Sequence, residues 1–111
     1  FYDISGAAVQ LGEYADFNEM DPSKQTRRNT IEDSLIHTVA TEFHGNVGLS
    51  VGYAADTTIQ HNELRNLTYG GVSVGWGWAR RPHTYAGGNR IVGNHIHHFK
   101  LQSDACALGD G

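Results

Sequence analysis

The chain has 111 residues, of which 39% are hydrophobic and 18% charged, and its net charge is -4. This length is sufficient for one domain with a core. No stretch approaches the roughly 18 apolar residues of a membrane-spanning helix, and none has the pattern of a signal peptide. The negative charge argues against nucleic acid as a partner, because phosphate binding needs clustered Lys and Arg. We therefore expect neither a membrane nor a nucleic-acid partner.

The first predicted strand is "AVQLG", residues 8–12, and it has three relatives further along the chain. They are "GLSVG" at 48–52, "GVSVG" at 71–75 and "ACALG" at 105–109. Small or polar residues alternate with apolar ones, which is the period of a strand with one buried face. The closing glycine of each copy predicts a bend that a side chain would obstruct.

A second, longer repeat occurs three times. Its copies are "NTIEDSLIH" from Asn29, "TTIQHNELR" from Thr57 and "NRIVGNHIH" from Asn89. Aligned on the isoleucines Ile31, Ile59 and Ile91, each copy has a polar residue three positions later and an aliphatic residue five positions later. The polar residues are Ser34, Asn62 and Asn94, and the aliphatic residues are Ile36, Leu64 and Ile96. This pattern predicts short strands that meet at polar bends.

Repeated short strands of this kind are typical of an all-β fold, the parallel β-helix, in which successive coils stack. We expect one partial domain over 1–111, with about four uncapped coils of a longer helix and insertions near 13–28 and 76–88. A leucine-rich horseshoe would need helical connections and a Leu-rich consensus, which are missing. We predict one buried column of Ile31, Ile59 and Ile91 and a second of Leu49, Val72 and Cys106. At the bends, Asn62 and Asn94 are expected to bond along the stack.

The candidate site lies just after the closing glycines, where the aligned residues are Glu13, Tyr53, Trp76 and Asp110. Trp76 opens an insertion that also contains Trp78, Arg80 and His83. Aromatic faces suit the C–H faces of sugars, and two carboxyl groups are the usual equipment of glycosidic cleavage. Arg80 and His83 are candidates for contacts with substrate hydroxyls or a uronate, or belong to a solvated loop.

The runs "GYAADTTIQHNELRNLTYGGVSVGWGW" and "NRIVGNHIHHFKLQSDACALGDG" resemble the right-handed parallel β-helix proteins of glycoside hydrolase family 141. Members of that family include an α-L-fucosidase and a xylanase, so the resemblance implies a secreted or periplasmic hydrolase of oligo- or polysaccharides, monomeric and without a cofactor. Asp110, followed by Gly111, matches the later of the family's two catalytic aspartates. At the matching upstream position this chain has Thr68-Tyr69-Gly70. Asp104 and Glu63 are the next catalytic candidates.

Two alternatives to a hydrolase remain open. A polysaccharide lyase on the same fold would need an acidic calcium cluster, for which Asp104 and Asp110 are too few. A non-catalytic β-helix, adhesin-like or carbohydrate-binding, would show short regular turns without the tryptophan-bearing insertion.

Metal binding is the remaining possibility raised by residue type. His61, His95, His97 and His98 are potential ligands, but His97 aligns with Arg65 and His37. We therefore predict that these histidines occupy repeated exposed positions and form no metal site. Cys106 falls at a core position, where a thiol behaves as a small hydrophobe.

Overall fold

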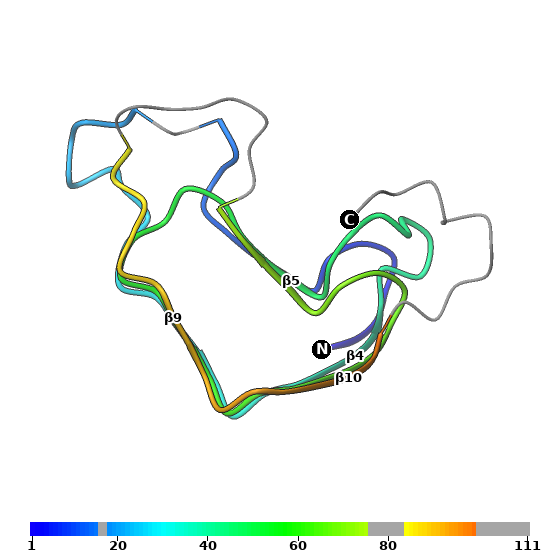
Figure 1. Ribbon diagram of the computed structural model, residues 1–111. Coiled ribbons are helices and arrows are strands. Elements are labelled where there is room, and N and C mark those ends of the chain that lie inside the picture. Colours follow the sequence, from blue (N-terminus) through cyan, green and yellow to red (C-terminus); the bar gives the residue numbers. More distant parts are fainter. Residues whose placement is uncertain (16–17, 76–83, 100–111) are drawn as a thin grey trace.

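The computed structural model describes residues 1–15, 18–75 and 84–99 (Figure 1). Every regular element in these ranges is a short β-strand, and they contain no helix long and apolar enough to cross a membrane. The strands are β1 (Tyr2–Ile4), β2 (Val9–Leu11), β3 (Thr30–Glu32), β4 (Leu35–Val39), β5 (Leu49–Val51), β6 (Thr58–Gln60), β7 (Glu63–Leu67), β8 (Val72–Val74), β9 (Arg90–Val92) and β10 (His95–Phe99). The all-β prediction is confirmed.

The strands form three sheets, and every pairing within them is parallel. The strand orders are β1-β4-β7-β10, β2-β5-β8 and β3-β6-β9. Strands three apart in the sequence are therefore neighbours in a sheet, because the chain enters each sheet in turn before returning to the first. Viewed along the stack, β9, β5 and the pair β4 and β10 lie on three different sides (Figure 1).

The isoleucine column predicted from the repeat is present, although it is not buried throughout. Ile31 pairs with Ile59, and Ile59 pairs with Ile91. Ile59 is 1% exposed, whereas Ile91 is 48% exposed because β9 is the last described strand of its sheet. The stacking is thus confirmed, but the prediction of burial is wrong for Ile91.

The pairing in the second predicted column is confirmed where it can be followed, although Val72 is only half-buried. Leu49 pairs with Val72 between β5 and β8, while Cys106 lies outside the described residues. Val74, two positions after Val72, is 40% exposed on the last described strand of this sheet. The inner coils therefore supply most of the core.

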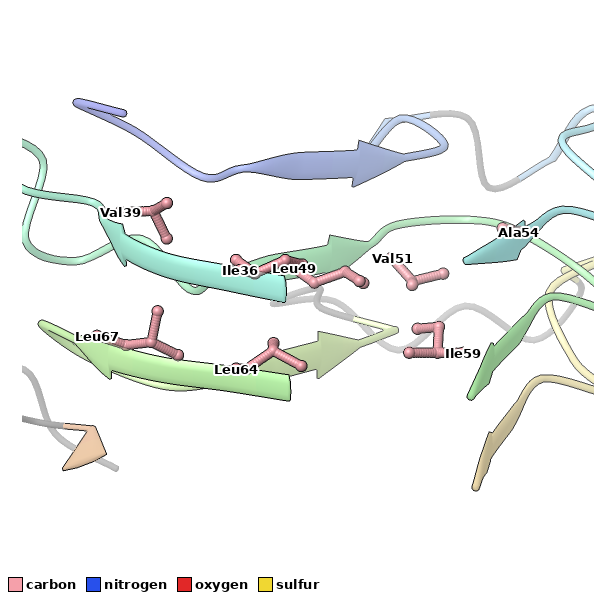
Figure 2. Close-up of a cluster of buried hydrophobic side chains, with 8 residues drawn as sticks. All are labelled: Ile36, Val39, Leu49, Val51, Ala54, Ile59, Leu64 and Leu67. Atoms are coloured by element: carbon pink, nitrogen blue, oxygen red, sulfur yellow. The ribbon is translucent and has the colours of Figure 1, made fainter. Parts of the chain in front are cut away.

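Eight buried residues, most of them from β4 to β7, make up that core, and they form two stacked rows (Figure 2). Figure 2 shows Ile36 above Leu64 and Val39 above Leu67, in agreement with the Ile36 to Leu64 register. The remaining members are Leu49, Val51, Ala54 and Ile59. Complete burial of such aliphatic side chains contributes about 1.5 to 3 kcal/mol each.

Backbone kinks recur at the same place in each copy of the sheet that contains β4, β7 and β10. Thr38, Asn66 and His98 all have positive φ, of 52° or 53°. Each of them directly follows a residue of one paired column, which contains His37, Arg65 and His97. Asp3 of β1 follows Tyr2, which pairs with His37, and has the same conformation. The kink lets residues three apart, such as Ile36 and Val39, both point inward, where a regular strand would place them on opposite faces.

The chain segments just before β3, β6 and β9 are aligned with one another. Residues 12–15 and 18–29, between β2 and β3, contain no strand. Isolated parallel bridges join Arg27 to Ala55 and Ala55 to Gly87. Asn89, just before β9, ties the chain to the preceding coil. Its side chain accepts a hydrogen bond from the Thr57 N–H at 2.9 Å and donates one to the Ala54 carbonyl at 2.9 Å.

Candidate functional site

The closing glycines bring consecutive coils into close contact at one corner. Gly12 has φ of 75°, and a Cβ built on it would lie 2.5 Å from the carbonyl oxygen of Tyr53. A Cβ on Gly52 would lie 2.8 Å from the carbonyl oxygen of Glu13. Gly75 has φ of 73°, so it repeats the bend in the next coil. Glycine is needed here both for the left-handed backbone and for the close approach of the chains.

This corner joins Glu13 and Tyr53, two of the residues predicted to bind substrate. The backbone N–H of Tyr53 donates to the Glu13 carbonyl at 3.0 Å. Glu13 is exposed and Tyr53 is half-buried. A carboxylate and an aromatic ring therefore extend from adjacent coils, as the alignment of the closing glycines predicted.

Tyr85 also belongs to this corner, and the sequence analysis did not identify it. Its hydroxyl donates to the Tyr53 carbonyl at 2.6 Å, across 32 positions of sequence. Tyr85 lies in the second insertion, outside both repeats, so alignment of the copies gives no signal for it. Its contact brings the end of that insertion to the Glu13 and Tyr53 corner.

Most of the other predicted site residues lie outside the ranges that the structure describes. They are Trp76, Trp78, Arg80, His83, Asp104 and Asp110. The register of β2, β5 and β8 continues to Gly75, whose N–H donates to the Val51 carbonyl at 2.9 Å. Trp76 directly follows Gly75 in the chain. The repeat alignment that predicted Trp76 as a site residue is therefore supported by the strand register as far as the residue before it.

Glu63, the remaining catalytic candidate, lies on β7 and faces outward from the sheet. His97 Nε2 lies 3.1 Å from Glu63 Oε1, and Arg65 Nε lies 3.2 Å from the same oxygen. The hydrogen bond with His97 is the largest effect on the Glu63 carboxyl and lowers its pKa. Desolvation opposes it to a smaller extent, and the Arg65 charge adds a still smaller lowering. Glu63 is therefore ionised at neutral pH, which suits a base, an anion or a ligand better than a general acid.

Two histidines gather beside this carboxylate. The rings of His95 and His97 are stacked, with centroids 4.2 Å apart and planes 23° from parallel. One ligand atom from each of Glu63, His95 and His97 lies within 4.8 Å of the others. The predicted column of His37, Arg65 and His97 is confirmed by the register. The repeat alignment gives no information on contacts between different columns, such as the contact of His97 with Glu63.

No protein-family model, curated protein or solved structure matches this chain. Two places in the described part of the fold are candidate functional sites. One is the Glu13 and Tyr53 corner, and the other is the outward face around Glu63.

Proposed function

We propose that this chain forms part of a right-handed parallel β-helix whose edge binds carbohydrate and takes part in cleaving glycosidic bonds. The three parallel sheets, entered in turn by the chain, support the helical architecture. Right-handedness follows from the strong preference of parallel crossover connections for that hand. The resemblance to glycoside hydrolase family 141 points to the same fold.

The observation that carries the functional proposal is the pairing of Glu13 and Tyr53 on adjacent coils. An aromatic ring offers a surface for the C–H face of a sugar, and a neighbouring carboxylate accepts hydrogen bonds from sugar hydroxyls. Successive coils lie about 4.8 Å apart, so an edge of repeated side chains suits an extended chain of sugar units. Trp76, next in the same series, would add a second aromatic surface.

Within this proposal Asp110 is the catalytic carboxylate, because it occupies the same position in the repeat and matches the family's later aspartate. Hydrolysis places a proton on the leaving glycosidic oxygen and the hydroxyl of water on the anomeric carbon. A pair of carboxyl groups divides this work between proton donor and base or nucleophile. Glu63 does not suit the donor role because its carboxyl is ionised.

The decisive experiment measures release of reducing ends from xylans and fucose-containing oligosaccharides by the purified protein. Asp110→Asn keeps the shape of the side chain but removes its charge and its proton. We expect turnover to fall by about 10²- to 10⁴-fold with an unchanged circular dichroism spectrum. Asp33→Asn is the matched control, because Asp33 is an exposed carboxylate at a different corner, and it should retain parental activity. Turnover of Asp110→Asn within a few-fold of the parent would reject Asp110 as catalytic.

Binding without cleavage is the second candidate function, since the Glu13 and Tyr53 corner supports it equally well. The same polysaccharides immobilised in a native gel would retard the protein, while no reducing ends appear. Tyr53→Ala keeps the backbone groups that bond to Glu13 and Tyr85 but removes the ring, so it should abolish retardation. Retardation that survives this substitution would place carbohydrate binding elsewhere.

A further inference from the structure

Glu63, His95 and His97 lie close together on the outward face of the sheet that contains β7 and β10. Glu63 and His95 are directly paired on neighbouring strands, and His97 pairs with Arg65 two positions further along. Residues two apart on a strand project from the same face, and paired strands lie about 4.8 Å apart. The inward face between them carries Leu64 and Ile96, which contact the core. The sheet therefore directs all three polar side chains to the same side.

The three side chains also meet at their ends. His97 Nε2 lies 3.1 Å from Glu63 Oε1, and the two imidazoles stack at 4.2 Å. All three ligand atoms lie within 4.8 Å of one another. In a tetrahedral zinc site with bonds of about 2.0 to 2.1 Å, ligand atoms are about 3.3 Å apart. The three ligand atoms would therefore have to move closer together to bind Zn²⁺, and His95, the exposed member, is the least constrained by its neighbours.

We propose that Glu63, His95 and His97 bind a divalent ion of the first transition row, with Zn²⁺ as the best match. Two imidazoles and one carboxylate are the ligands that such ions prefer, whereas Ca²⁺ and Mg²⁺ favour sites built from oxygen alone. Three protein ligands leave a coordination position for water or another small ligand. The site lies on the outward face of β7 and β10, and it does not depend on the proposed glycosidase function.

Neighbouring groups define how His97 would act as a ligand. His97 Nδ1 contacts His98 Nδ1, so Nε2 is the nitrogen that faces Glu63. A second partner on the other ring nitrogen is the usual way in which a metal-binding histidine is oriented. Arg65 is the opposing group, because its Nε lies 3.2 Å from Glu63 Oε1 without forming a hydrogen bond. Metal binding would therefore require the Arg65 guanidinium to move toward solvent.

The test is calorimetric titration of the chelator-treated protein with ZnCl₂ alone. We expect one Zn²⁺ per chain in the parent. His95→Gln and His97→Gln should each weaken binding at least about 10-fold, because loss of a direct ligand should cost no less than loss of a second-shell partner. Glu63→Gln keeps the side-chain size and should also weaken binding. Circular dichroism of each variant, recorded without metal, should match the parent.

His61→Gln is the matched control, because His61 is also exposed and lies 3.9 Å from a carboxylate, that of Asp33, at another corner. It should leave the affinity for Zn²⁺ unchanged. Equal weakening by His61→Gln and His95→Gln would show diffuse binding to surface histidines and overturn the proposal. A parent that binds no Zn²⁺ at millimolar concentration would overturn it as well. A variant whose spectrum changes is replaced by the corresponding Ala substitution, and the same comparison decides.

Discussion

Asn62 and Asn94 are joined both by their side chains and through the backbone of Asn62. Asn62 Nδ2 donates to Asn94 Oδ1 at 3.0 Å, and the Asn62 N–H donates to the same oxygen at 2.9 Å. Toward the preceding coil, Asn62 Nδ2 donates to the Ile31 carbonyl at 3.0 Å, and Oδ1 accepts from the Ser34 N–H at 3.0 Å. One side chain thus satisfies polar groups of both neighbouring coils, which confirms the structural role predicted for these bend residues.

Asn62→Ala should therefore destabilise the protein strongly. Asn62 is 2% exposed, so its removal leaves the Ser34 N–H and the Ile31 carbonyl without their partner in a region that water does not easily reach. The expected loss is about 2 to 4 kcal/mol in the free energy of unfolding, since each unsatisfied buried group costs about 1 to 3 kcal/mol. Denaturant unfolding followed by circular dichroism measures it.

Gln60→Ala is the control for this substitution. Gln60 lies two residues earlier, and its amide donates to Glu32 Oε2 at 2.7 Å in an exposed contact. Its loss should change the free energy of unfolding by no more than about 0.5 kcal/mol. If Asn62→Ala and Gln60→Ala have equal effects, the asparagine ladder does not stabilise the stack.

The sequence repeat predicted the register because the same spacing of apolar and polar residues appears in each copy. Ile31, Ile59 and Ile91 occupy the same place in the three copies, and the structure pairs them. The kink at Thr38 could not be predicted in the same way. Threonine rarely adopts positive φ, unlike the asparagine at the equivalent position 66, so tertiary pairing, and not local preference, sets the backbone at Thr38.

The sequence repeat predicted neighbouring site residues only where they occupy the same position in successive copies. Glu13 and Tyr53 occupy equivalent positions after closing glycines, so alignment alone brought them together. The cluster of Glu63, His95 and His97 combines two columns, one through Glu63 and His95 and the next through His97. Which columns touch depends on side-chain rotamers across the sheet, and a repeat alignment does not contain that information.

Gly12→Ala should destabilise the corner that carries Glu13 and Tyr53. The φ of 75° at Gly12 is unfavourable for a residue with a Cβ, and the new Cβ would lie 2.5 Å from a backbone oxygen that cannot move alone. The left-handed conformation costs about 1 to 2 kcal/mol, to which the steric clash adds. Thermal unfolding should show a clear decrease in melting temperature.

Gly45→Ala provides the comparison, because a Cβ at Gly45 meets no atom within 4 Å. Its effect should range from neutral to a gain of about 1 kcal/mol, since alanine restricts the unfolded chain. A Gly12→Ala protein as stable as Gly45→Ala would contradict the close approach of the two coils at this corner.

The titration of Glu63 depends mainly on its contact with His97. Its pKa is lowered mainly by the hydrogen bond with His97, so His97→Ala should raise the pKa toward the ordinary value of a glutamate. Because the folded-state pKa lies below the unfolded one, the stabilisation from this contact is present above the unfolded pKa and is lost as pH falls through the folded pKa. Carbon-detected NMR of the Glu63 carboxyl, in the presence of a chelator, measures the shift.

Arg65→Gln separates the hydrogen bond from the charge. Arg65 Nε lies 3.2 Å from the Glu63 carboxylate but is not hydrogen-bonded to it, and both side chains are partly exposed, so solvent screens their attraction. The pKa of Glu63 should therefore rise less in Arg65→Gln than in His97→Ala, and the acid-side loss of stability should remain. If Arg65→Gln raises the pKa more, charge and not the His97 hydrogen bond holds Glu63 in its ionised form.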